Sequence, residues 1–391
     1  MQLINNKYYG GGKEMLKATL KNRQEIEDFV RGCTFYGTGG GGLPENGIDS
    51  LVSELEKGKE IGWIDINDIS DDDLTVCPFL MGSIAPHTEE AIKEMASLGL
   101  DTVKNKQKDC LAIAIKELSN YTGKKVDALI PIELGGANTP GCIAAGLITG
   151  IPTIDGDYTG RAIPEISQTT PYLYDKPLLP ITTVDAWGNI CIIKHSTSYP
   201  VAERIGKLLS AASYGLTGDA GFFLTGKEVK EVIIPGTLTE CYNIGKLIRE
   251  TRETGKDPIT EITKSLGGWV ISRGKVVKKE WEDRVGYYWG THTISGEGEF
   301  KGDTTKIWFK NENHICWKND EVLVTSPDII TVVDVVTGEP LANPKISEDD
   351  NVAVIGLKAR PVFRSEKGIG ILGPKAFGFD YDYVPIENRL K

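Results

Sequence analysis

The chain has 391 residues, of which 25% are charged and 40% hydrophobic, and its formal net charge is -11. This composition is that of a globular protein and excludes the disordered and fibrous classes. The acidic balance and the lack of a basic run argue against nucleic acid or an anionic membrane surface as a partner. The length favours two domains over one.

The first residues are expected to lie outside the fold. Residues 10–15 read Gly-Gly-Gly-Lys-Glu-Met, which back-translates into purine-rich codons directly ahead of an ATG codon. A ribosome-binding site that is read in frame would give this pattern. We therefore expect Met15 to be the natural start and residues 1–14 to be a leader that takes no part in the fold.

Helical and strand patterns alternate over residues 15–170. A helix is expected over residues 22–33, because Asn22 can cap it and Glu25 follows three residues later. Periodic patterns predict further helices over residues 48–57, 88–98, 107–121 and 140–148, and apolar runs predict buried strands over 74–81, 126–132 and 151–154. This alternation predicts an α/β domain with a parallel or mixed sheet and flanking helices.

The pattern changes in the second half. Residues 178–184 and 190–195 flank a turn and predict a β-hairpin, and helices then dominate to about residue 265. Short β-rich runs with turn residues between them follow to the end of the chain. The sequence thus predicts an α/β domain over 15–170, continuing with helices to about 265, and a mostly-β domain over 266–391.

A loop after the predicted strand 151–154 has the densest set of reactive side chains. It contains Asp155, Asp157, Arg161 and Glu165 within eleven residues. Paired carboxylates can activate water or hold a metal ion, and an arginine can bind a substrate carboxylate with two hydrogen bonds. The alternative is a solvated loop with a structural Asp–Arg pair. The functional interpretation predicts Asp155, Asp157 and Glu165 as catalytic and Arg161 as substrate-binding.

Residues 37–42 form a second candidate loop, with five glycines in six positions. The backbone N–H groups around Thr38, Gly39, Gly40 and Gly41 could cradle an anion or an oxyanion of the substrate. No Lys-Ser/Thr pair follows the glycines, and a helix precedes them where a dinucleotide fingerprint needs a strand. No nucleotide is therefore expected, although a nucleotide-binding protein and a plain flexible turn remain alternatives.

The third candidate loop, residues 133–141, follows the predicted strand 126–132. Glu133 would emerge at the end of that strand, where a carboxylate is placed to act as a base or a ligand. Asn138 can both donate and accept hydrogen bonds, although it could instead cap the following helix. We predict Glu133 as catalytic and Asn138 as substrate-binding.

Seven scattered cysteines without a CxxC pair argue against a disulfide framework and favour a reducing compartment. No run reaches the length of a membrane span, and no secretory signal is apparent. A cytoplasmic location is therefore expected. The cofactor is unknown. A divalent metal ion such as zinc, held by aspartates from distant segments, remains an alternative.

The three loops together resemble motifs of the S-methyl thiohydantoin desulfurase-like family, which accompanies hydantoinase and oxoprolinase genes. The similar segments are Tyr-Gly-Thr-Gly-Gly-Gly-Gly at 36–42, Glu-Leu-Gly-Gly-Ala-Asn-Thr at 133–139, and Asp-Gly-Asp at 155–157 with Gly-Arg-Ala at 160–162 and Pro-Glu at 164–165. The resemblance runs from about Lys17 to the C-terminus, where Gly-Pro-Lys-Ala-Phe-Gly at 373–378 also fits.

The resemblance implies an N-terminal α/β domain, a C-terminal β-rich domain, and hydrolysis at C2 of a cyclic isothiourea. Such a reaction releases methanethiol and leaves a hydantoin. The expected partner is a small cyclic substrate, with a homo-oligomer or a hydantoinase-type partner protein as open possibilities. The main alternative function is a non-catalytic subunit of a hydantoinase- or oxoprolinase-type enzyme.

Overall fold

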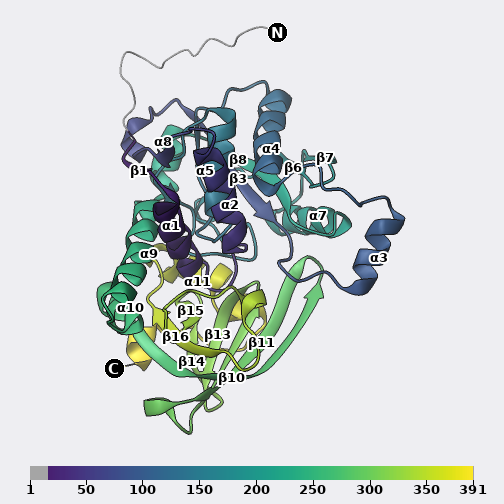
Figure 1. The fold of residues 1–391 in the computed structure, drawn as a ribbon. Coiled ribbons are helices and arrows are strands. Elements are labelled where there is room, and N and C mark those ends of the chain that lie inside the picture. Colours follow the sequence, from purple (N-terminus) through teal and green to yellow (C-terminus); the bar gives the residue numbers. More distant parts are fainter. Residues whose placement is uncertain (1–15, 391) are drawn as a thin grey trace.

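The computed structural model describes residues 16–390, so the expected leader at 1–14 lies outside the described residues. The first two thirds of the chain form an α/β body, and a curled antiparallel sheet closes it from below (Figure 1). The predicted fold class, an α/β domain followed by a mostly-β domain, is confirmed. Within residues 16–390, no helix combines the length and the apolar character that crossing a membrane requires.

The α/β body is built on a five-stranded mixed sheet with the strand order β4-β3-β8-β6-β7. Only β3 and β4 run parallel, and every other neighbouring pair is antiparallel. The predicted hairpin is confirmed as β6 and β7. The strands are β3 (Leu74–Met81), β4 (Ala128–Leu129), β6 (Ile181–Val184), β7 (Ile190–Ile193) and β8 (Thr217–Thr225).

Two predicted strands are shorter than expected, and proline explains both. Residues 126–132 pair only over β4, because Pro131 lacks the N–H that would continue the ladder. Residues 151–154 contain Pro152 and make only isolated bridges, at Thr153 and Ile154. The long central strand β8 was not predicted, because its sequence Thr-Gly-Asp-Ala-Gly-Phe-Phe-Leu-Thr lacks a clear alternation.

Side chains of β3 alternate between two cores on the two faces of the sheet. Val76 packs in one core with helix α4, and Phe79 packs in the other with helix α7. The helices of the body are α1 (Arg23–Tyr36), α2 (Pro44–Leu55), α3 (Glu89–Ser97), α4 (Gln107–Thr122), α5 (Asn138–Thr149), α6 (Thr170–Leu173), α7 (Tyr199–Ala212) and α8 (Gly226–Val232). Two short ribbons, β1 (Ala18–Leu20) with β2 (Ile61–Trp63) and β5 (Gly156–Asp157) with β9 (Ile234–Pro235), complete it.

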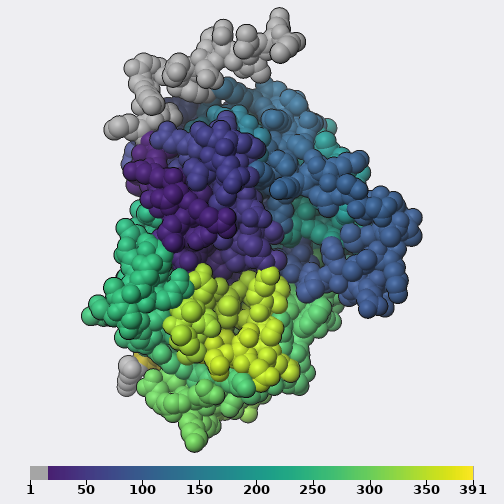
Figure 2. Space-filling view, in the orientation of Figure 1, coloured from purple at the N-terminus to yellow at the C-terminus, as the bar shows by residue number. Residues whose placement is uncertain are grey.

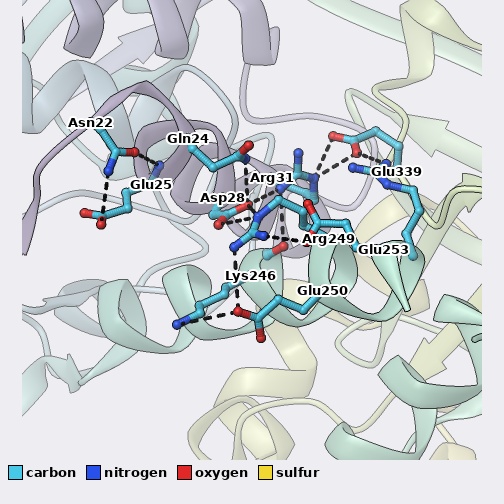
Figure 3. A network of polar contacts seen from close by, with 12 residues as sticks. Asn22, Gln24, Glu25, Asp28, Arg31, Lys246, Arg249, Glu250, Glu253 and Glu339 are labelled. Atoms are coloured by element: carbon cyan, nitrogen blue, oxygen red, sulfur yellow. Dashed lines mark hydrogen bonds and ion pairs between the residues drawn. The ribbon is translucent and has the colours of Figure 1, made fainter. Parts of the chain in front are cut away.

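Helix α9 (Thr237–Glu253) packs directly against α1, and α10 (Pro258–Leu266) continues from it. The two helices approach closely because Gly32 of α1 faces the backbone of α9. A Cβ atom at Gly32 would lie 1.7 Å from the Cys241 carbonyl oxygen. Figure 3 shows the polar side of this contact, where the buried Asp28 carboxylate accepts from Arg31 at 2.6 Å and from Arg249 at 3.0 Å. Arg31 also pairs with Glu339, which ties α1 to the C-terminal sheet.

The C-terminal sheet has seven antiparallel strands in the order β14-β13-β12-β11-β10-β16-β15. Its first two strands, β10 (Trp269–Arg284) and β11 (Tyr287–Gly296), form a long hairpin that reaches up beside the α/β body (Figure 1). The others are β12 (Thr304–Lys310), β13 (Glu312–Lys318), β14 (Glu321–Thr325), β15 (Ile329–Asp334) and β16 (Asn351–Leu357), followed by α11 (Glu366–Leu372) and α12 (Ile386–Arg389). The predicted boundary near 266 remains a prediction.

Candidate active site

A small pocket lies where the α/β body meets the C-terminal sheet. Its volume is about 40 Å³, and its walls come from the glycine loop, β3, the 133–138 and 163–166 loops, α7 and the turn between β12 and β13. Its polar side chains are those of Glu133, Asn138, Glu165, Glu203, Lys207, Asn311 and Glu312. The pocket therefore brings together four carboxyl groups and one ammonium group from segments far apart in the chain.

Glu133 is held in a fixed orientation by neighbouring donors. Its Oε1 accepts a 2.7 Å hydrogen bond from Asn138 Nδ2, and its Oε2 accepts from the Ile163 backbone N–H at 2.8 Å. Asn138 is itself fixed, because its Oδ1 accepts from the Leu80 N–H at 3.0 Å. Burial raises the pKa of Glu133 to about 7, against these hydrogen bonds, which favour the ionised form. This carboxyl group can therefore exchange a proton near neutral pH.

Glu312 reaches the same pocket from the other domain, at the start of β13. Its Oε1 accepts from the Gly41 N–H at 3.2 Å, while its Oε2 is buried with no hydrogen-bond partner in the described residues. Burial and then the charge of Glu133 raise the pKa of Glu312 well above its usual range. Because the charge of Glu133 disfavours ionisation of Glu312, one carboxyl group of the pair can keep its proton while the other ionises.

Lys207 on α7 supplies the positive charge of the pocket. It is 4% exposed, and its Nζ lies 3.7 Å from Glu203 Oε1 and 3.5 Å from the Gly82 carbonyl oxygen. Both contacts are long for an ammonium group. Glu203 is better held, by the Tyr287 hydroxyl at 2.9 Å and the Ile166 N–H at 2.9 Å. A buried, loosely held cation can interact with negative charge that develops in the pocket.

Glu165 stands at the edge of the pocket. It forms an ion pair with Lys310, and the Lys310 ammonium lies 4.1 Å from the centre of the Tyr287 ring. The Lys207 ammonium lies 4.3 Å from the centre of the same ring. The Tyr287 ring, from the start of β11, therefore contacts the ammonium groups of both ion pairs, Lys310–Glu165 and Lys207–Glu203.

The glycine loop, residues 37–42, is buried at the domain interface. The Thr38 and Gly39 carbonyl oxygens accept from the Asn313 and Asn343 N–H groups, each at 2.7 Å. A Cβ at Gly40 would lie 2.0 Å from Glu312 Oε1, so only glycine lets this carboxylate approach. The structure brings Gly41 to the pocket wall, whereas Thr38, Gly39 and Gly40 contact the C-terminal sheet.

Arg161 is a structural link between the two domains. Its Nε donates to the Ala162 carbonyl oxygen, and its Nη1 and Nη2 groups donate to the carbonyl oxygens of Pro327, Asp328 and Asn313 and to the Thr38 hydroxyl. These five hydrogen bonds occupy all five N–H groups of the guanidinium. No donor remains for a substrate carboxylate, and these contacts favour a structural role of Arg161 over the predicted substrate-binding role.

The two aspartates of the same loop lie outside the pocket. Asp155 caps α9, since its Oδ1 accepts from the Leu238 and Thr239 N–H groups at 3.0 and 3.1 Å. Asp157 is buried and closes its own turn by accepting from the Gly160 N–H at 2.6 Å. Burial raises the pKa of Asp157 to about 6. Of the four carboxylates predicted as catalytic, Glu133 and Glu165 line the pocket, and Asp155 and Asp157 hold the loop and helix behind it.

The sequence interpretation missed Glu203, Lys207 and Glu312. The first two lie on an amphipathic helix, where their i and i+4 spacing is typical of a surface ion pair. Glu312 follows Asn311, which has a positive φ of 58° at a tight turn between two apolar strands. A carboxylate beside an asparagine turn of this kind was the one available signal, and it is a weak one.

A divalent metal ion such as zinc stays a prediction. Among residues 16–390, no three His, Cys, Asp or Glu side chains are grouped so that they could hold a metal ion. The free cysteines Cys77 and Cys142 are buried, and burial raises the pKa of each thiol. Both thiols are therefore disfavoured as thiolate nucleophiles.

Comparisons with known proteins assign the chain to a family. The family model described as S-Me-THD-like, N-terminal domain, matches residues 24–195, and the one described as S-Me-THD-like, C-terminal domain, matches residues 197–386. A crystal structure of a protein from Chromobacterium violaceum has a TM-score of 0.74 and 17% sequence identity, covering 94% of this chain and 100% of that chain. At this identity the likeness concerns the fold alone. No curated protein matches the chain.

Proposed function

Because the chain belongs to the S-Me-THD-like family, we propose that it is a hydrolase acting on a cyclic isothiourea or amide such as an S-methyl thiohydantoin. The observation that carries the proposal is the pair Glu133 and Glu312. The two carboxyl groups line one pocket and come from different domains, and burial raises the pKa of both. A pair of this kind can provide the base and the acid that hydrolysis of a ring needs near neutral pH.

Glu133 is the proposed general base. In its ionised form it takes a proton from a water molecule, whose oxygen attacks C2 of the ring. Protonated Glu312 donates its proton to the adjacent ring nitrogen, so that the adduct at C2 carries a hydroxyl group and the methylthio group. Asn138 and the Ile163 N–H keep Glu133 oriented for this transfer.

The second step breaks the bond between C2 and sulfur. Glu133 returns its proton to the leaving sulfur, and the hydroxyl group of the adduct passes its proton to Glu312 as the carbonyl forms. One water is consumed, methanethiol and a hydantoin are released, and both carboxyl groups regain their starting states without any redox change. Lys207 stabilises the negative charge that develops on the substrate during both steps.

The test is turnover by the purified chain alone, with S-methyl-2-thiohydantoin as substrate and released thiol as the readout. Glu133→Gln and Glu312→Gln should each lower kcat by about 100-fold or more, since general acid–base catalysis contributes factors of about 10² to 10⁴. Glu56→Gln, at the exposed end of α2, is the matched control and should keep full activity.

Two results would overturn the proposal. The first is full turnover by either glutamine variant after its folding has been checked by thermal unfolding. The second is the absence of thiol release by the chain alone together with release after addition of a hydantoinase-type protein. The second result would favour the alternative, a non-catalytic partner subunit.

A further inference from the structure

A second, larger cavity adjoins the pocket. Its volume is about 300 Å³, and it lies between the segment that leads into α3, the end of α7, and the tip of the β10–β11 hairpin. In Figure 2 the blue segment that carries α3 projects from the side of the molecule. Figure 1 shows that the tip of the β10–β11 hairpin points toward this segment. The residues lining this outer cavity include Ser83, Ala91, Ser210, Ala211, Asp283 and Gly286.

Two segments, the end of β3 and helix α7, line both the outer cavity and the pocket. At the end of β3, Gly82 lines the pocket and Ser83 lines the outer cavity. On α7, Lys207 lines the pocket and Ser210 lines the outer cavity. Tyr287, which holds Glu203 in the pocket, directly follows Gly286 of the outer cavity. The two spaces are therefore neighbours along α7 and along the end of β3, and the hairpin is linked to the pocket through the Tyr287 hydroxyl group.

The partition between them is weakly held. It centres on the Gly82 carbonyl oxygen, whose contacts from Lys207 Nζ and Asn311 Nδ2 are both 3.5 Å long. Gly82 itself has a φ of 141°, which side chains rarely adopt. No short side-chain hydrogen bond therefore holds the Gly82 carbonyl group in the described residues.

The sizes of the two spaces suggest how they divide a substrate. A volume of about 40 Å³ has room for a few water molecules, given that one water needs about 10–15 Å³ by this kind of measure. The C2 edge of a substrate ring can approach Glu133 and Glu312 in this pocket. A substituent elsewhere on the ring needs further space. The outer cavity offers that space on the side of Gly82 and Lys207.

We propose that the outer cavity binds the substituent on the ring carbon of the substrate, and so sets the specificity of the site. This inference rests on the proposed function. The walls supply hydroxyl groups, methyl groups, backbone, the Tyr214 ring and the His87 imidazole, and no lysine or arginine is among the lining residues. The His87 Nε2 atom is already engaged by the Tyr214 carbonyl oxygen at 2.5 Å. The one carboxylate among the lining residues is that of Asp283. The cavity therefore suits a short, hydrogen-bonding substituent that is uncharged or positively charged, and it disfavours a carboxylate.

The experiment compares matched substrates on matched variants. S-methyl-2-thiohydantoin without a substituent is compared with its 5-hydroxymethyl and 5-carboxymethyl derivatives. Ala211→Phe fills the outer cavity, whereas Ala212→Phe places the same side chain at the next exposed position of α7, which does not line it. Ala91→Phe fills the cavity from the opposite wall and serves if the first variant does not fold.

The expected result is a change in specificity. Ala211→Phe should lower the kcat/KM of the hydroxymethyl substrate, relative to the unsubstituted ring, by about tenfold or more, and Ala212→Phe should leave this ratio as in the wild type. The carboxymethyl substrate should be at least about tenfold poorer than the hydroxymethyl one, and Asp283→Asn should narrow that difference. An unchanged ratio in both cavity-filling variants, or a preference for the carboxymethyl ring that Asp283→Asn does not alter, would overturn the inference.

Failure of the proposed function can be told apart from failure of this inference. Turnover of the unsubstituted ring by the wild type tests the function, whatever the variants do. If the wild type turns over none of the rings, the Kd of 5-hydroxymethylhydantoin is measured by calorimetry on the same variants. Weakening by Ala211→Phe alone would support the outer cavity as a binding site, and equal affinity in all variants would end the proposal.

Discussion

The backbone N–H of Gly41 donates to the carboxylate of Glu312, and this contact joins a loop of the α/β body to the first residue of β13. The same glycine accepts, through its carbonyl oxygen, from the N–H groups of Ala137 and Asn138 at 3.0 and 3.1 Å. Gly41 thus connects the segment that orients Glu133 with the segment that carries Glu312. The spacing of the two carboxyl groups depends on how the domains are docked.

The first prediction concerns the pH dependence of catalysis. A base with a pKa of about 7 is protonated at lower pH and cannot accept a proton, so kcat/KM should fall about tenfold per pH unit below pH 7. Glu133→Gln should abolish this acidic limb along with most of the activity. A pH–rate profile that stays flat down to pH 5 in the wild type would argue against Glu133 as the base.

The second prediction concerns Asp219, which lies on β8 and is buried without a hydrogen-bond partner for either carboxyl oxygen in the described residues. Burial raises its pKa to about 8, whereas in the unfolded chain it is about 3.9. The folded state therefore binds the proton more tightly. The stability that this provides is present below about pH 4 and is lost as the pH rises toward 8.

Asp219→Asn removes this ionisable group and nearly keeps its shape. The variant should be more stable than the wild type at pH 8, and its advantage should shrink toward pH 5. Urea unfolding of both proteins at the two pH values measures the difference. An equal change in stability at pH 5 and pH 8 would show that the buried carboxyl group is not protonated in the folded state.

The third prediction concerns Arg161. Lysine has three N–H donors in place of five and cannot reproduce the planar arrangement that holds Thr38, Asn313 and Asp328. Arg161→Lys should therefore lower the free energy of unfolding by about 3 kcal/mol or more. Arg23→Lys, in an exposed helical ion pair, should cost less than about 0.5 kcal/mol. A normally stable Arg161→Lys protein with a raised KM would restore the substrate-binding interpretation.

The fourth prediction compares two glycines with positive φ. A Cβ at Gly39, whose φ is 90°, would lie 2.4 Å from Asn343 Nδ2, while a Cβ at Gly58, whose φ is 76°, would meet nothing within 4 Å. Gly58→Ala should cost about 1–2 kcal/mol from the backbone alone. Gly39→Ala should cost clearly more, since it also pushes the two domains apart. Equal thermal shifts for the two variants would show that the interface yields to the added methyl group.

The sequence predicted the elements that depend on local pattern. Asn22 caps α1 by accepting from the Glu25 N–H at 3.0 Å, as expected, and the apolar run of β3 is a buried strand. The glycine loop and the 133–138 loop were also recognised as unusual, because residues such as Gly40 and Glu133 stand out without any knowledge of their neighbours.

What the sequence did not predict depends on contacts between distant segments. Glu312 is 179 positions from Glu133, and only the weak signal of the preceding Asn311 distinguishes it locally from a surface glutamate. Asp155 and Arg161, in contrast, stand out in the sequence but have structural partners. Asp155 accepts hydrogen bonds at the N-terminus of α9, and Arg161 donates to carbonyl groups of the other domain. A charged residue in a conspicuous loop can be there to hold the loop, and only its hydrogen-bond partners distinguish the two cases.

The position of β8 has a consequence for how members of this family can be cut and recombined. The two family models meet at residues 195–197, yet β8, which follows that point, lies between β3 and β6 of the first half. A fragment ending at 195 would lack the middle of its own sheet, and chimaeras joined there would have to match a foreign strand to both neighbours. A junction between α10 and β10, after residue 266, would keep that sheet from a single parent.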